Sequence, residues 1–131
     1  MTGLPESTTA ALADLAGQTA AWCDKAGLAA EADRLRALPA ITGLDVLADA
    51  AATVNPIMHA AYRRSGVVSW PQAAAGADAA RDAQVAKHAA GHSVGVDHFS
   101  KTYRRVNNYA DWLWTTAVYA AHAAVTDGAS R

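Results

Sequence analysis

The chain has 131 residues, of which 52% are hydrophobic and 18% are charged, and its formal net charge at pH 7 is −1. This length suffices for one domain with its own core, without disulfides or a structural metal. The nearly neutral charge excludes the basic surface that nucleic-acid binding needs, so no nucleic-acid partner is expected. The single cysteine, Cys23, excludes an internal disulfide and any metal site built on paired cysteines.

Alanine, the strongest helix former, is abundant, whereas β-branched and aromatic residues are too scattered to indicate several strands. We therefore expect an all-α fold: a compact bundle of about five helices in a single domain, 1–131, with 1–6 and 127–131 flexible. No secretory signal pattern opens the chain. The most apolar run, Tyr109 to Thr126, carries Asp111 and His122 and is not expected to cross a membrane. A cytoplasmic protein is expected.

Three helices are predicted in the first half of the chain, at Ser7–Lys25, Leu28–Leu38 and Thr42–Arg64. Gly27 and Pro39 end the first two, and Gly66 ends the third. In the third helix, apolar residues recur at alternating intervals of three and four, and this register is kept through Pro56. Because proline removes a backbone donor and clashes with the carbonyl four residues back, we expect one helix that is kinked at Pro56.

A fourth helix is predicted to follow Ser69, with Pro71 in its first turn, and to run to about Ala90. Ser69 is its predicted N-cap, and Gln72 is the residue that reaches back in a capping box. A turn is expected over residues 91–96, followed by a cap at Asp97 or Ser93 for the last helix.

The last predicted helix, Asp97 to Thr126, is the element around which the others are expected to be organised. Apolar residues recur along it at alternating intervals of four and three, from Phe99 to Ala124. A surface helix would carry charges over half its circumference, and this one does not. It is therefore expected to be central, covered by other helices or by a second copy of the chain. One flank holds Arg105, Asn108, Trp112, Thr115, Tyr119 and His122, and the other holds Asn107, Asp111 and Trp114.

His88 and His92 are the first candidate site. On an uninterrupted helix they would share one face and could bind a metal, with Asp97 or His98 completing the ligand set. Gly91 lies between them, however, and predicts that the helix stops before His92. The chain also has no Glu-x-x-His partner, no glycine-rich phosphate loop and no nucleophile elbow. We therefore expect no metal and no other cofactor.

Asn55, His59 and Tyr62 fall together on the third helix, beside its apolar seam. His59 can exchange a proton near neutral pH, and Tyr62 can donate a hydrogen bond to a developing oxyanion. These two are the candidate catalytic residues, and Asn55 is a candidate substrate-binding residue. The alternative is a half-buried histidine–tyrosine pair whose members hydrogen-bond to each other.

The polar and aromatic residues of the last helix form the third candidate. Asn107 and Asn108 are adjacent, although asparagine is unfavourable within a helix because its side chain competes for backbone hydrogen bonds. Two in a row indicate a specific partner, either a substrate or the same helix of a second subunit. Aromatic residues and arginine are enriched at interfaces, so a homodimer with a pocket at its seam is expected. The candidate substrate-binding residues of this helix are Tyr103, Asn107, Asn108, Asp111, Trp112 and Tyr119.

The chain is small, helical and alanine-rich, and it has no cofactor motif. In these properties, and in its His59/Tyr62 and Asn107–Trp112 segments, it resembles the proteins that form lysinoalanine bridges in cinnamycin- and duramycin-type lanthipeptides. The resemblance implies a cofactor-independent homodimer that holds a folded peptide in a groove between subunits. It also implies that the lysine ε-amine of the peptide adds to dehydroalanine. His59 would then be the base or orient it, and Tyr62 and Asn108 would donate hydrogen bonds.

In the same reading, Trp112 and Tyr103 would grip the peptide, and a carboxylate of the substrate could itself serve as the base. Two other classes of function stay open. One is a non-catalytic helical module that binds a partner protein or a small-molecule regulator. The other is a helical bundle that binds a metal through histidines.

Overall fold

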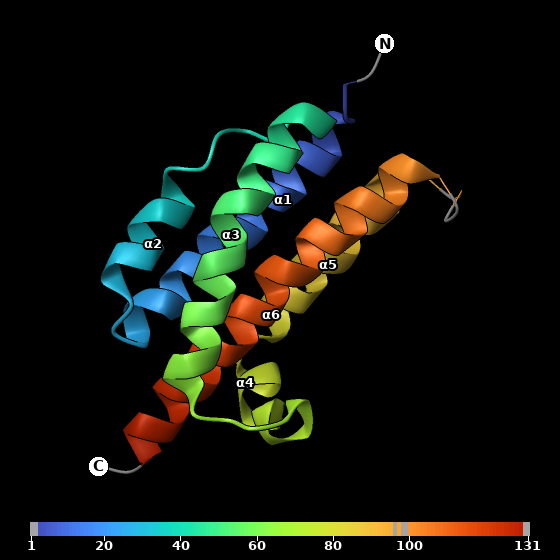
Figure 1. Ribbon diagram of the computed structural model, residues 1–131. Helices are drawn as coiled ribbons and strands as arrows, with labels where there is room; N and C mark the ends of the chain where they lie inside the picture. The colour runs from blue at the N-terminus through green and yellow to red at the C-terminus, as the bar shows by residue number, and fades with distance from the viewer. Residues whose placement is uncertain (1–2, 96, 98–99, 130–131) are drawn as a thin grey trace.

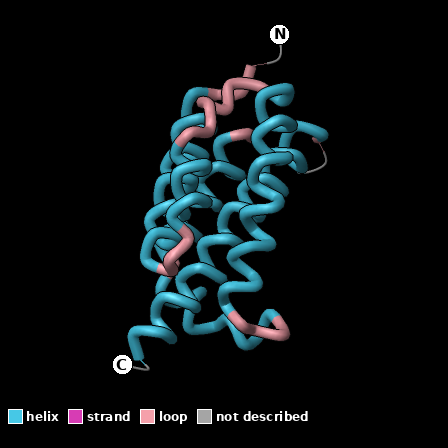
Figure 2. The backbone as a smooth tube through the Cα atoms, turned by 60° about the vertical axis from the view of Figure 1, so that its left-hand side comes forward, coloured by secondary structure: helices cyan, strands magenta, loops and turns pink. Residues whose placement is uncertain are grey.

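The computed structural model describes residues 3–95, 97 and 100–129. Throughout this part of the chain the fold is all-α, as predicted, with six α-helices and one short 3-10 helix. The long helices run side by side, and α1 begins at the opposite end of the bundle from the end of α6 (Figure 1). Helix extends along nearly all of the backbone (Figure 2). The elements are α1 (Glu6–Lys25), α2 (Ala29–Arg36), α3 (Leu44–Ser65), η1 (Trp70–Ala73), α4 (Ala74–Ala79), α5 (Arg81–Ser93) and α6 (Lys101–Ala129).

Helix α6 is the central element, as predicted, and it contacts α1, α3, α4 and α5. Its apolar seam is fully buried at Val106, Ala110, Leu113 and Ala117. Phe99, where the predicted seam begins, lies outside the described residues. The chain's own helices thus supply much of the cover that the sequence led us to expect for α6. The share of that cover expected from a second copy stays a prediction.

Small side chains let the helices approach closely on the side of α1. Thr19 of α1 donates a hydrogen bond from its Oγ1 to the Leu113 carbonyl of α6, at 3.1 Å. The Thr8 hydroxyl, at the start of α1, lies 2.5 Å from the Ser93 hydroxyl at the end of α5. Both threonines are fully buried, so their hydroxyls need partners. Thr8 finds its partner across the helix interface, while Thr19 shares its hydroxyl proton between the Leu113 carbonyl and the Leu15 carbonyl of its own helix, at 2.8 Å.

The predicted helix boundaries hold at several points. Gly27 and Gly66 follow α1 and α3 with φ of 80° and 73°, a conformation that ends a helix at little cost only for glycine. Helix α3 continues through Pro56 as a single helix, as predicted. At the other end of the bundle, the Leu4 N–H donates to the Thr42 carbonyl at 2.8 Å, so the start of the chain is tied to the start of α3.

The prediction of one continuous fourth helix is wrong. The segment is divided into η1, α4 and α5, and the break lies at Ala80, whose backbone has φ −91° and ψ 27°. In Figure 1, α4 lies at an angle to α5, so the break lets each segment follow its own neighbour. The capping is also different: Ser69 makes no side-chain cap, and the Gln72 Oε1 accepts from the Val68 N–H at 2.8 Å.

The prediction that a turn covers residues 91–96 is wrong for the first three of them, because α5 continues through Gly91 and His92 to Ser93. The cap of the last helix also differs from the prediction. The Ser100 Oγ accepts from the Tyr103 N–H at 3.0 Å, one turn into α6, so Ser100 rather than Asp97 or Ser93 caps this helix.

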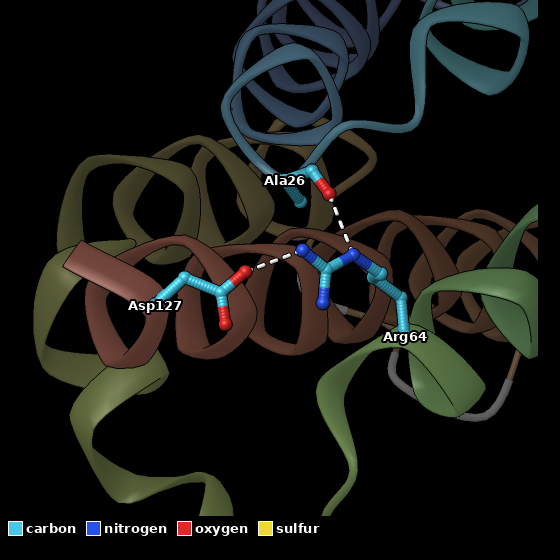
Figure 3. A network of polar contacts seen from close by, with 3 residues as sticks. All are labelled: Ala26, Arg64 and Asp127. Carbon is cyan, nitrogen blue, oxygen red and sulfur yellow. Dashed lines mark hydrogen bonds and ion pairs between the residues drawn. The ribbon is translucent and has the colours of Figure 1, made fainter. Parts of the chain in front are cut away.

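Arg64, near the end of α3, connects the ends of three helices (Figure 3). Its Nε donates to the Ala26 carbonyl, just after α1, at 2.8 Å, and its guanidinium forms an ion pair with Asp127 of α6. Asp127, expected to begin a flexible end, therefore lies within α6 and is paired.

Among the described residues, no helix combines the length and the apolar character that crossing a membrane requires.

Candidate functional site

A groove with a volume of about 380 Å³ lies between the second half of α3 and the middle of α6. We call it the α3–α6 groove. Five of the residues that the sequence predicts to act together, His59, Tyr62, Asp111, Trp112 and Tyr119, meet in it. They do so because residues three and four apart share a helix face and the two faces are opposed. The lining residues are Met58, His59, Tyr62, Asp111, Trp112, Thr115 and Tyr119.

A second hollow, of about 240 Å³, continues the groove toward the start of α6. Trp112 lines both, so its indole stands between them. The hollow brings in Asn108, a predicted substrate-binding residue whose side chain is exposed, and Arg105. The opposite wall is apolar, formed by Leu47 and Ala51 of α3. The two cavities together form a trough along the α3–α6 seam.

Four aromatic rings form a cluster at the far end of the groove, and two of them, Tyr62 and Tyr119, line it. Tyr62 and Tyr119 meet edge to face with centroids 5.2 Å apart, and Trp70 packs on Tyr119 at 5.7 Å and on Trp114 at 5.4 Å. Such pairs each contribute about 0.5–1.5 kcal/mol beyond their buried area, so they hold the Tyr62 and Tyr119 rings in place. Burial, and then the neighbouring Tyr62, raise the pKa of the Tyr119 hydroxyl.

The two candidate catalytic residues are open to a ligand. His59 is exposed, and Tyr62 keeps 39% of its surface exposed. The alternative in which they satisfy each other is not seen: no hydrogen bond joins them in the described chain, and the Tyr62 ring packs on Tyr119. An imidazole and a phenol thus face the same groove with their polar atoms available to a bound molecule.

Asp111 lines the groove, and its negative charge is partly neutralised by Lys87. Its Oδ1 lies 2.9 Å from the Nζ of Lys87 on α5, and that ammonium also lies 4.5 Å from the centre of the Trp114 ring. Lys87 is largely buried, while Asp111 is half exposed. The carboxylate can therefore also meet a cation that enters the groove from solvent.

Lys87 and Trp70 were not among the residues predicted from the sequence. Lys87 lies in an alanine-rich stretch that gives no sign of which helix it faces. Trp70 lies in a Ser-Trp-Pro-Gln segment that predicts a helix start. The segment gives no indication that the Trp70 ring packs against Trp114 of α6. A tryptophan at a helix start with more than half of its surface covered could have suggested a docking role, but only once its neighbours were known.

Three predicted substrate-binding residues line neither the groove nor the hollow beside it. Asn55 is half buried on α3, about one turn before His59. Tyr103 and Asn107 lie on the other flank of α6, where they line a small cavity of about 40 Å³ together with residues of α5. The α5 residues of that cavity are His88, Gly91 and His92.

A further cavity, of about 330 Å³, lies between α1, α2 and the segment that leads to α3. Its walls are mainly apolar, and Tyr109 of α6 lines it with only 2% of its surface exposed. Burial raises the pKa of the Tyr109 hydroxyl to about 12. Arg36 at the rim is already paired with Asp24, at 2.5 Å. The cavity therefore offers apolar contact and one hydroxyl, but no group for acid–base chemistry near pH 7.

Comparison of the chain with models of protein families, with curated proteins and with solved structures found no match. A fold class alone does not determine function, because function resides in sites that many folds can carry. The function of this all-α chain is accordingly inferred from the residues, contacts and charges of the α3–α6 groove.

Proposed function

We propose that the protein binds a peptide in the α3–α6 groove and promotes the addition of a lysine ε-amine to dehydroalanine. The observation that carries the proposal is the convergence of His59, Tyr62 and Trp112 on one groove. The groove has a volume of about 380 Å³, within the range of ligand sites, and the hollow beside Trp112 adds about 240 Å³. Their end-to-end arrangement suits an extended ligand.

The reaction needs acid–base chemistry and no oxidant or reductant. The lysine nitrogen attacks the Cβ of dehydroalanine, a C–N bond forms, and the π electrons of the alkene move toward the adjacent carbonyl as an enolate. The nitrogen loses a proton and the Cα gains one, so the product is an isomer of the substrate. A base, a hydrogen-bond donor for the enolate oxygen and a fixed geometry are the requirements.

The groove residues fit these requirements. His59 accepts the proton of the attacking amine, and Tyr62 donates a hydrogen bond to the enolate oxygen. Both are open to a ligand, as the exposed fraction of Tyr62 and the absence of a mutual hydrogen bond in the described chain indicate. Asp111 draws the lysine ammonium into the groove, although Lys87 offsets part of its charge. Trp112 and Asn108 hold the peptide on either side of the reacting atoms.

The proposal includes a homodimer whose seam lies over the groove. Tyr62 and Trp70 keep 39% and 44% of their surfaces exposed, and they adjoin each other through Tyr119. Adjacent exposed aromatic side chains are typical of interaction surfaces. Light scattering at several protein concentrations tests the homodimer. A molar mass of one chain at every concentration would contradict it, and the peptide groove would then belong to a monomer.

The second candidate, a non-catalytic peptide-binding module, is favoured by one observation. The groove presents the aromatic rings of Tyr62, Trp112 and Tyr119, which suit peptide binding, and its one carboxylate is already paired with Lys87. In this case the protein binds the same peptide without changing the rate at which the lysine adds.

The test uses a synthetic peptide that contains lysine and dehydroalanine. Because the product is isomeric, the assay follows the loss of dehydroalanine that a thiol can trap, while fluorescence anisotropy of a labelled peptide follows binding. We expect the full chain to accelerate the loss. His59→Gln and Tyr62→Phe should slow the reaction by about 10²-fold, within the range of acid–base contributions, without weakening binding.

Two further variants separate the outcomes. Trp112→Ala should weaken binding, while Arg63→Gln, an exposed change on α3 outside the groove, should alter neither binding nor rate. Binding without acceleration in the wild-type chain would support the non-catalytic module. No binding of the peptide at all would overturn both proposals for this groove.

A further inference from the structure

We propose that α5 and α6 form a binding site for one divalent transition-metal ion, held by His88, His92 and Asn107. We call it the α5–α6 site. It lies on the flank of α6 opposite the α3–α6 groove and does not depend on the function proposed for that groove.

The first step is the continuity of α5. The sequence predicts that the helix stops at Gly91, which would separate the two histidines, but α5 extends from Arg81 to Ser93. His88 and His92 are therefore one turn apart on a single helix face, with neighbouring Cβ atoms about 6 Å apart. This spacing lets two imidazole nitrogens reach one metal ion.

The second step is the approach of α6. Gly91 is buried, and a Cβ placed on it would lie 3.5 Å from the Asn107 Oδ1 and 3.9 Å from a ring carbon of Tyr103. The amide oxygen of Asn107 thus comes to α5 at the turn that carries both histidines. His88, Gly91, His92, Tyr103 and Asn107 line one cavity of about 40 Å³, which has room for an ion and a water molecule.

The third step is the choice of metal. Imidazole nitrogens favour zinc, copper and nickel. In the proposed site the amide oxygen of Asn107 and one water molecule join the two imidazoles in a four-coordinate shell. Magnesium and calcium prefer shells of oxygen ligands, mainly carboxylates. In the described chain no three histidine, cysteine or carboxylate side chains gather at one point. The proposed site therefore takes as its third protein ligand the amide oxygen of Asn107, which approaches α5 at Gly91. This position also explains why asparagine is tolerated within the helix at 107.

The experiment titrates zinc chloride into the chelator-treated full-length chain by isothermal titration calorimetry, with a thermal melt in parallel. We expect one zinc ion per chain and a rise in Tm, because the ion joins α5 to α6 in the folded state only. His88→Ala and His92→Ala should each weaken binding by more than the ~10–100-fold that loss of an outer-shell group costs.

A register control separates the site from exposed histidines in general. The double variant His88→Ala/Val85→His keeps two histidines on α5 but places them seven residues, or about 10 Å, apart. Val85 is 64% exposed, so the substitution leaves the core intact. We expect this variant to bind no better than His88→Ala. Affinity equal to that of the wild type would overturn the proposed site.

The Asn107 position gives a second readout, which loss of folding cannot imitate. Asn107→Asp replaces a neutral amide oxygen by a charged one of the same shape and should tighten zinc binding, whereas Asn107→Leu should weaken it. Equal affinity in the wild type, Asn107→Asp and Asn107→Leu would remove α6 from the site and overturn the proposal. The absence of saturable one-to-one binding in the wild type would do the same.

Discussion

Gly76 of α4 lies so close to α6 that a Cβ on it would stand 2.1 Å from the carbonyl oxygen of Val118. The same atom would be 2.7 Å from the backbone nitrogen of His122. These are backbone atoms, which cannot rotate away as a flexible side chain can. Helix α4 therefore packs on α6 at this distance only because residue 76 has no side chain.

We expect Gly76→Ala to lower the free energy of unfolding by at least about 2 kcal/mol, as overpacking does in tight cores. Urea unfolding followed by circular dichroism measures this change. Displacing α4 should also move η1, which precedes it directly, so that Trp70 leaves Trp114 and Tyr119. Tryptophan emission should then shift to longer wavelength in the native variant.

Gly17→Ala is the matched control, because it makes the same change within α1. A Cβ on Gly17 would meet nothing within 4 Å. Alanine in a helix interior is favoured over glycine by about 0.5–1 kcal/mol, so this variant should be more stable than the wild type. If Gly76→Ala proved equally stabilising, the close packing of α4 on α6 would be refuted.

Arg64 provides a second prediction, since it joins the ends of α1, α3 and α6. Arg64→Ala leaves the half-buried Ala26 carbonyl without its donor and should cost about 1–3 kcal/mol in the free energy of unfolding. The exposed ion pair with Asp127 adds little. Most of the loss should therefore persist in 1 M salt, which screens ion pairs but not the carbonyl contact. Urea unfolding at low and high salt measures both effects.

Arg63→Ala removes the adjacent arginine of α3, which is exposed and has no hydrogen-bond or ion-pair partner in the described chain. We expect its effect to stay within about 0.5 kcal/mol. A loss that is equal for the two arginines, or one that disappears for Arg64→Ala in high salt, would show that net charge, rather than the Ala26 contact, is responsible.

The sequence predicted the fold class and the central helix because both depend on periodicity. The seam of α6 recurs every three or four residues, and Leu113 and Ala117 are fully buried where the pattern places them. The ends at Gly27 and Gly66 were predictable for a different reason: the positive φ of each is a local requirement that glycine meets. Signals of this kind do not depend on the rest of the fold.

The breaks between helices depend on tertiary packing and could not be read in the same way. Ala80 is a strong helix former, yet the helix breaks there, where α4 turns toward α6. Gly91 is a weak helix former, yet α5 continues through it, where it is buried beside Asn107 and Tyr103 of α6. At both positions packing against α6 outweighs a propensity difference of about 1 kcal/mol.

The candidate site was predictable only one helix at a time. The sequence placed Asn107 and Asn108 on different flanks of α6, since adjacent helical residues point about 100° apart. It could not show that one flank faces α3 and the other faces α5. His59 and Trp112 share a groove, while Asn107 belongs to a cavity with His88, because of helix packing that no local pattern encodes.

A third prediction concerns the Lys87–Asp111 pair, which is 2.9 Å long with the lysine largely buried. We expect Lys87→Met to destabilise the fold, because it removes the ion pair and the contact with the Trp114 ring. A double-mutant cycle with Asp111→Asn should give a coupling energy of about 0.5–1 kcal/mol, since one partner is half exposed. Measured unfolding energies that add without coupling would show that the pair contributes no stability.

The last prediction concerns alkaline pH. Burial, followed by the charges of Glu31 and Asp24, raises the pKa of the Cys23 thiol from 9.0 to about 12. Above about pH 9 the unfolded chain loses this proton while the folded chain retains it, so ionisation favours unfolding. The free energy of unfolding should therefore fall by about 1.4 kcal/mol per pH unit between about pH 9 and about pH 12. Urea unfolding at intervals from pH 8 to about pH 10 measures the slope.

Cys23→Ala isolates the contribution of the thiol. Ionisation of the buried Tyr109 hydroxyl also lowers the free energy of unfolding, but only at higher pH. Burial raises the pKa of Tyr109 from 10.0 to about 12, so in the variant the fall in stability should begin only near pH 10. A thiol reagent gives an independent measurement: since Cys23 is wholly buried and protonated at pH 8, labelling should be no faster than opening of the fold. Rapid labelling of the native chain, or identical pH slopes for the wild type and Cys23→Ala, would place the thiol at the surface instead.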